Sequence, residues 1–374
     1  MALIKDVYST EFYQQFASDA DSAVPGFNAE LFLREVQPPD FGAMEFKQRM
    51  LHTAHVFHQA LPAGFSESAE SFAGLISYLK DREAADKLAY VFLPEYIALY
   101  GIDHFSRSAE LLELVTQFVS AEFAVRPFLL RYFDEMIAVM HRWSQHADHR
   151  VRRLASEGSR PRLPWALAIP ALKRDPTPVL QLLENLMPDP SPWVRKSVAN
   201  HLNDISKDHP DVLLRVVCRW KLHSPETDAI IKHACRTLFK QGYPAVLSLY
   251  GLDTAGITLS DFRLSAPEAS PSLPLSFSFC LKNELTRPKL VRIEYAVYHL
   301  RAKGQLIPKV FKISERTIQP GEELTMTRKH PFKPITTRVY YPGTHQVALI
   351  INGSPLSTLP FELSGVQTNL PGSF

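Results

Sequence analysis

The sequence is poor in the features that mark secreted, metal-binding or membrane-spanning proteins. It has three cysteines, Cys218, Cys235 and Cys280, whose odd number and wide spacing argue against a disulfide framework and a paired Cys-x-x-Cys zinc site. No run reaches the roughly 18 apolar residues of a membrane helix. The N-terminus carries an acid early and lacks the basic then apolar run of a signal peptide. We therefore expect a cytoplasmic protein with no membrane contact, no metal and no cofactor.

Motifs of several catalytic classes are also missing. The sequence has no Gly-rich phosphate loop and no Ser/His/Asp or Cys/His grouping with usable spacing. His52, His55 and His58 recur every three residues, but on a helix they fan over about 120°, which is too wide for one metal ion. At 374 residues and 45% hydrophobic composition, the chain has enough apolar matter for two or three packed domains.

The net charge of +2 conceals a gradient along the chain. Residues 1–120 carry a net charge of −9, residues 121–250 carry +6 and residues 251–374 carry +5. A basic middle and tail favour association with a polyanion, because Lys and Arg neutralise phosphates. The alternative is a solvated basic face, since charges clustered in sequence need not cluster in space.

Apolar spacing predicts helices from about Phe46 to Leu249, where apolar residues recur at intervals of three and four. Val151-Arg152-Arg153 returns 43 residues later as Val194-Arg195-Lys196, and Ile231-Lys232-His233 is a related third copy. These intervals are typical of HEAT repeats, whose stacked helix pairs form a curved solenoid. We therefore predict a HEAT-like α-solenoid over residues 1–252.

The C-terminal part has a different period. Residues 253–274 are rich in Gly, Ser, Asp and Pro, as in a linker between domains. Beyond them, alternation of apolar and polar residues predicts strands at 275–281, 291–297, 310–316, 324–328 and 346–351. About seven short strands in this length are typical of an immunoglobulin-like sandwich. The fold class is therefore multidomain, α then β, with the immunoglobulin-like β-sandwich at residues 275–374.

The helix expected from Trp193 to Lys207 has two faces. Ser191 is placed to cap it, and Pro192 suits its first turn. One apolar stripe must pack against neighbouring helices: Val194, Val198, Leu202 and Ile205. A second stripe, about 125° away, has Lys196 and Lys207 beside it and consists of Trp193, Ser197, Asn200 and Asp204. The second stripe predicts a surface that contacts a ligand. The alternative is that Trp193 packs on an adjacent repeat and that Asp204 forms an ion pair with a basic side chain.

The repeat brings a second acid towards this stripe. Glu157 aligns with Asn200, so we expect Glu157 and Asp204 to project from neighbouring helices into one concave surface. Arg160, Arg162 and Trp165 follow Glu157 closely, and Glu122 precedes an earlier basic helix. Carboxylates repel phosphates, so their presence in a basic segment indicates that a cationic group is held there.

Two runs resemble a known family: Glu157-Gly-Ser-Arg-Pro-Arg-Leu-Pro-Trp165 and Trp193-Val-Arg-Lys-Ser-Val-Ala-Asn-His-Leu-Asn-Asp-Ile-Ser-Lys-Asp-His-Pro210. They are similar to the AlkC branch of the AlkC/AlkD HEAT-like-repeat DNA glycosylases, over about residues 1–250. Some AlkC proteins also carry a C-terminal immunoglobulin-like domain. The resemblance implies removal of 3-methyladenine and 3-methylcytosine from duplex DNA without base flipping. It also implies catalytic or contact roles for Glu157, Asp204, Trp165, Trp193 and Glu122.

The chemistry of such a reaction agrees with these residues. An alkylated base is a good leaving group, and positive charge develops on the sugar as the bond breaks. A fixed carboxylate stabilises that charge and positions water. We expect catalytic roles for Glu157, Asp204 and Glu122 and substrate contacts by Trp165, Trp193 and Asn200. We expect DNA-backbone contacts by Arg152, Arg153, Arg160, Arg162, Lys196 and Lys207.

The expected partner is double-stranded DNA containing alkylated bases, bound by a monomer. The alternative is a non-catalytic HEAT-repeat scaffold that binds DNA or protein.

Overall fold

The computed structural model describes residues 3–82, 87–333 and 339–365. The chain divides into two compact units, Met1–Ala234 and Cys235–Phe374. Within the described ranges, no helix has both the length and the apolar character needed to cross a bilayer.

The first half of the helical unit packs around aromatic side chains. Its helices are α1 (Thr10–Ala23), α2 (Ala29–Glu35), α3 (Phe46–Ala60), α4 (Phe65–Asp81), α5 (Phe92–Tyr100), α6 (Phe105–Thr116) and α7 (Val125–Arg131). Phe16, Phe32, Phe57, Phe72 and Phe92 are fully buried among them. Helices therefore begin well before Phe46, where the apolar spacing placed their start.

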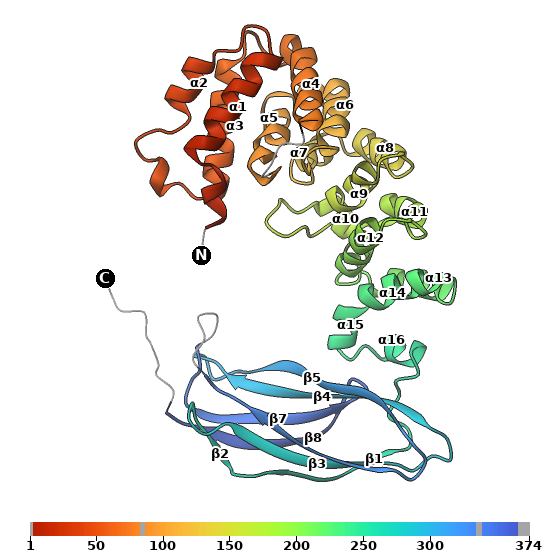
Figure 1. Cartoon of the computed structure of the whole chain (residues 1–374). Helices are drawn as coiled ribbons and strands as arrows, with labels where there is room; N and C mark the ends of the chain where they lie inside the picture. Colours follow the sequence, from red (N-terminus) through yellow and green to blue (C-terminus); the bar gives the residue numbers. More distant parts are fainter. Residues whose placement is uncertain (1–2, 83–86, 334–338, 366–374) are drawn as a thin grey trace. The chain divides into compact units, whose positions relative to one another are not determined.

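The second half of this unit is built from stacked helix pairs. Its helices are α8 (Phe133–Trp143), α9 (His149–Gly158), α10 (Pro170–Arg174), α11 (Thr177–Leu186), α12 (Pro192–Ile205), α13 (Pro210–Trp220) and α14 (Pro225–Ala234). Helices α9, α12 and α14 pack in one row. Helices α8, α11 and α13 form a second row along one side of the first (Figure 1). The middle helix, α12, therefore has neighbours on two faces.

Equivalent side-chain contacts show the repeat directly. The Arg152 guanidinium donates to the carbonyls of His146 and Ala147. Arg195, 43 positions later, donates in the same way to the carbonyls of Asp189 and Pro190, each also 43 positions later. The predicted HEAT-like repeat is thus confirmed, and these arginines tie the start of each inner helix to the loop before it.

The second unit is a β-sandwich with two short helices, α15 (Arg236–Lys240) and α16 (Pro244–Leu249). Its strands are β1 (Ile257–Leu264), β2 (Glu268–Ala269), β3 (Leu275–Asn283), β4 (Lys289–Leu300), β5 (Leu306–Ile318), β6 (Glu323–His330), β7 (Gly343–Ile351) and β8 (Ser354–Leu363). One sheet has the order β1-β3-β6 and the other β2-β8-β7-β4-β5. Both sheets contribute to one apolar core. The five strands predicted from alternation are β3 to β7, and β8 was not predicted.

Two predicted boundaries are corrected. Residues 253–274 do not form only a linker, because β1 pairs antiparallel with β3. The register of this pairing shifts between Ser260 and Arg263, where Asp261 has φ 53°. A polar edge strand with such a bulge lacks regular alternation, so its sequence looks like that of a linker. The helical domain also ends before residue 252. Helices α15 and α16 belong to the sandwich unit. Asp253, which follows them, forms an ion pair with Lys289, and its backbone carbonyl accepts a hydrogen bond from the Asn352 side chain.

Candidate functional site

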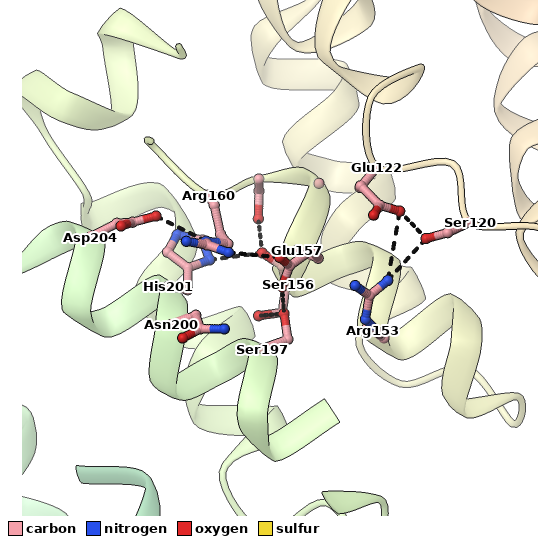
Figure 2. Close-up of polar contacts among 12 residues, drawn as sticks. Ser120, Glu122, Arg153, Ser156, Glu157, Arg160, Ser197, Asn200, His201 and Asp204 are labelled. Atoms are coloured by element: carbon pink, nitrogen blue, oxygen red, sulfur yellow. Dashed lines mark hydrogen bonds and ion pairs between the residues drawn. The ribbon is translucent and has the colours of Figure 1, made fainter. Parts of the chain in front are cut away.

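A buried arginine joins the two predicted carboxylates. Glu157 lies in the last turn of α9, Asp204 lies in α12, and Arg160 follows α9 (Figure 2). The Arg160 Nη1 donates to Glu157 Oε1 at 2.7 Å, and its Nε donates to Asp204 Oδ2 at 2.9 Å. The exposed fractions are 7% for Glu157, 6% for Arg160 and 1% for Asp204. The structure thus brings the two acids together, as the repeat predicted, but it buries them between α9 and α12, and the expectation that they project into a concave surface is wrong.

The remaining carboxylate oxygens are also bound. Ser197 Oγ donates to Glu157 Oε2 at 2.6 Å, and Lys207 Nζ donates to Asp204 Oδ1 at 2.9 Å. Charge-assisted bonds of this kind fix both side chains in one orientation. The Glu157 side chain is 9% exposed and the Asp204 side chain 2%, so both acids are buried. We call Glu157, Arg160, Ser197 and Asp204 the inner cluster.

The burial of α12 corrects the predicted ligand-facing stripe. Val194, Val198, Leu202 and Ile205 are buried, as predicted, but Ser197 and Asp204 of the second stripe are buried too. The reason is tertiary: α9 packs on this face of α12, and Arg160 folds back over it. Trp193 is 47% exposed and Asn200 is half-buried, accepting a hydrogen bond from His233 of α14. Ser191 precedes Pro192 as predicted, but its side chain makes no capping bond.

His201 lies beside the inner cluster and is fully buried. Its Nδ1 lies 2.9 Å from the Ser156 carbonyl, which can only accept, so Nδ1 carries the proton. Burial lowers the pKa of His201 to about 4, so the ring is neutral at pH 7. His201 therefore links α12 to α9 without adding charge next to Arg160.

A second buried arginine lies beneath the cluster. Arg126 of α7 is 1% exposed, and its Nη1 donates to the carbonyls of Gly158 and Arg160, both at 2.9 Å. Burial, and then the neighbouring charge of Arg160, lower the pKa of Arg126 to about 10. The close approach of α7 to α9 requires Gly158, because a Cβ there would lie 2.6 Å from Val125 Cγ2.

Neither Arg126 nor His201 was identified from the sequence. The available signal was a single arginine in the apolar run Ala124-Val-Arg-Pro-Phe-Leu-Leu130, and a histidine next to Leu202 of the apolar stripe.

Glu122 belongs to a separate, more exposed group. It accepts a short hydrogen bond from Ser120, and Arg153 Nη1 lies 2.9 Å from Ser120 Oγ and 3.6 Å from Glu122 Oε2 (Figure 2). The Arg153 guanidinium lies 4.5 Å from the centre of the Trp193 ring. We call Ser120, Glu122, Arg153 and Trp193 the outer cluster.

A cavity of about 310 Å³ adjoins the outer cluster. Its lining includes the polar or aromatic residues Ser120, Arg150, Arg153 and Trp193 and the apolar residues Leu88, Val91, Phe118 and Val119. The outer cluster therefore has an open, partly apolar space beside its charged groups.

The predicted backbone contacts fall into two groups. The prediction of phosphate contacts is corrected for Arg152 and Arg160. Arg152 pairs with Asp189 through two hydrogen bonds, of 2.6 and 3.1 Å, and Arg160 is buried in the inner cluster. Structural pairing, rather than phosphate binding, accounts for both. Lys196 is exposed on the rim of a groove between α12 and α14, and the Lys207 and Arg162 side chains are 38% and 37% exposed. Arg162 is paired with Asp208.

Trp165 has a largely exposed side chain. It is 79% exposed in the loop of residues 159–169 that connects α9 and α10. No group of three or more His, Cys, Asp or Glu residues suited to a metal ion occurs in the described part of the chain.

Comparison with known proteins identifies the family. Residues 114–238 match the DNA alkylation repair enzyme family, and residues 258–365 match the C-terminal Ig-like domain of the uncharacterised protein YhaZ. The uncharacterized protein YhaZ of Bacillus subtilis (strain 168) is 42% identical over 365 residues, covering 97% of this chain and 100% of that protein.

A solved structure matches over the same length. It is the Pseudomonas fluorescens alkylpurine DNA glycosylase AlkC bound to DNA containing an abasic site analog. Its TM-score is 0.88 at 35% identity, covering 97% of this chain and 100% of that one. The predicted fold class is therefore confirmed, including the immunoglobulin-like sandwich. The chain belongs to the DNA alkylation repair enzyme family, in its AlkC branch.

Proposed function

We propose that this protein is a DNA glycosylase that excises cationic N-methylated bases, 3-methyladenine and 3-methylcytosine, from double-stranded DNA without flipping the base, and that it acts as a monomer. The similarity to an alkylpurine DNA glycosylase supports the reaction type. The observation that carries the proposal is the inner cluster, in which Arg160 and Ser197 hold both oxygens of the Glu157 carboxylate in one orientation.

In the proposed reaction, the methylated base leaves as a neutral group because it already bears the positive charge. The deoxyribose becomes oxocarbenium-like as the glycosidic bond breaks. The Glu157 carboxylate stabilises this charge, and because its orientation is already fixed it needs little reorganisation. Asp204 acts as a positioning residue through Arg160, since both of its oxygens are bound inside the protein.

The outer cluster supplies the complementary role. The Glu122 side chain is 17% exposed and that of Glu157 9%. In the proposed reaction, Glu122 orients or deprotonates the attacking water. The indoles of Trp165 and Trp193 pack against the cationic nucleotide by cation–π contacts, and Asn200 contributes a polar contact. Arg153, Arg162, Lys196 and Lys207 contact phosphates and fix the duplex in register.

The test is chromatographic identification of the bases released from methylated duplex DNA. We expect release of 3-methyladenine and 3-methylcytosine together with abasic sites, and no release from undamaged duplex of the same sequence. A non-catalytic scaffold would instead show salt-sensitive binding without preference for methylated DNA and without abasic product. Glu157→Gln protein purified in the same way controls for contaminating glycosylases.

A further inference from the structure

The loop of residues 159–169 exposes a second large apolar side chain beside Trp165. In Figure 1 this loop extends from the helices between α9 and α10. Leu167 is 60% exposed, two positions after Trp165 at 79%. Two large apolar side chains exposed only two positions apart in one loop favour a contact surface there. The reaction proposed above gives Leu167 no role.

The loop is closed and anchored at its base. Leu163 and Ile169 are buried, and the Ile169 amide donates to the Pro161 carbonyl at 3.2 Å. Trp165 has φ 63°, in the left-handed region that costs a residue other than glycine roughly 1–2 kcal/mol. Such a conformation persists only where the surroundings enforce it.

The surroundings include two basic side chains from distant helices. Arg126 donates through Nε to the Leu167 carbonyl, and Lys47 of α3 donates to the Trp165 carbonyl. Both bonds hold the backbone of the tip and leave its apolar side chains exposed. The tip is therefore preorganised.

Arg126 also connects the tip to the inner cluster. Its Nη1 binds the carbonyls of Gly158, next to Glu157, and of Arg160, while its Nε binds Leu167. One rigid, planar guanidinium therefore sets the position of Leu167 relative to the carboxylate assigned to the sugar.

We propose that Leu167 is a wedge that enters the base stack of the bound duplex next to the damaged nucleotide, with Arg126 as the residue that positions it. Apolar side chains such as Leu that insert between base steps unstack them and kink the duplex. Residues 121–250 carry a net charge of +6, which favours DNA over a neutral protein surface as the occupant. The inference rests on the proposed function only in taking duplex DNA as the ligand.

The test uses a duplex that contains a tetrahydrofuran abasic analogue with 2-aminopurine as the neighbouring base. Wild-type protein at saturation should raise the 2-aminopurine fluorescence, because the base loses its stacking. Leu167→Ala should abolish the rise and weaken binding about tenfold, because the apolar area that leucine buries between the bases is lost. Leu167→Phe should restore the rise. Leu33→Ala, at a 42% exposed leucine of α2, is the matched control and should behave as wild type.

Arg126 is tested in the same assay by a double-mutant cycle. Arg126→Lys keeps the charge but cannot reach all three carbonyls, so we expect a reduced fluorescence rise. The same change in the Leu167→Ala background should have no further effect on the rise, because the residue it positions is already missing. If Arg126→Lys proves unfolded by circular dichroism, the Leu167 series decides the proposal alone.

The outcomes separate this inference from the proposed function. An undiminished rise with Leu167→Ala, or no rise with saturating wild type, overturns the wedge even if the protein releases methylated bases. A rise that depends on Leu167 supports the wedge even if no base is released, because the tetrahydrofuran duplex needs no chemistry.

Discussion

The inner and outer clusters of the helical unit differ in how many of their carboxylate oxygens are bound by other side chains. In the inner cluster, the four oxygens of Glu157 and Asp204 are bound by Arg160, Ser197 and Lys207. In the outer cluster, Glu122 has a serine and a more distant arginine as partners, and that serine and arginine line an open cavity. The difference indicates that the inner cluster is a fixed, buried network of charges, whereas the more exposed outer cluster can exchange its contacts with solvent.

The largest effect on stability should follow from breaking the inner cluster. Asp204→Asn leaves Arg160 and Lys207 without a full counter-charge, and removal of one partner of a buried pair costs about 3–5 kcal/mol. All four tryptophans lie in the helical unit, so urea unfolding followed by tryptophan fluorescence reports on this unit. Asp208→Asn is the control, because the pair that Asp208 makes with Arg162 is more exposed and should contribute under about 1 kcal/mol. Equal losses in the two variants would contradict the distinction.

The next largest effect is the pH dependence that His201 gives to the unfolding free energy. Burial lowers its folded-state pKa to about 4 from 6.5, so the unfolded chain binds more protons between these values and stability falls as the pH falls from 6.5 to 4. The loss due to this residue is about 3 kcal/mol. His201→Asn retains a donor for the Ser156 carbonyl and removes the titration, so its unfolding free energy should depend less on pH. An unchanged pH profile in His201→Asn would count against the buried neutral ring.

The smallest effect on stability should come from the outer cluster. Glu122→Gln should change the unfolding free energy by less than about 1 kcal/mol, because its ion pair is partly exposed. Excision should nevertheless slow about 100-fold if Glu122 activates water. Parallel unfolding and single-turnover measurements on this variant check both statements. Large destabilisation with unchanged excision would reverse the roles assigned to the two clusters.

Sequence reasoning located the elements of the site through the repeat. The 43-residue interval placed α9 next to α12 and so brought Glu157 near Asp204. Burial could not be predicted in the same way, because it depends on the loop after α9, which turns Arg160 back between the two acids. The basic residues Arg152 and Arg153 are adjacent in sequence, yet one pairs with Asp189 and the other lies over Trp193. Only the packing of neighbouring helices distinguishes them.

In the sandwich, period-two alternation identified the strands that bury one face. It failed for β1, which bulges at Asp261, and for β8, which contains Pro355 and Pro360. Proline normally argues against a strand because it lacks the amide donor. The register of β8 on β7 shows both prolines within the pairing.

The most direct test of the account is the single-turnover rate of Glu157→Gln on duplex DNA containing 3-methyladenine. Glutamine preserves the shape and can keep hydrogen bonds to Arg160 and Ser197 but removes the negative charge. We expect excision to fall about 1000-fold, as for the loss of a fixed electrostatic contact, with unchanged affinity for abasic duplex. Full activity in this variant, and in the Glu157→Gln, Asp204→Asn double variant, would contradict the claim that the inner cluster stabilises charge on the sugar.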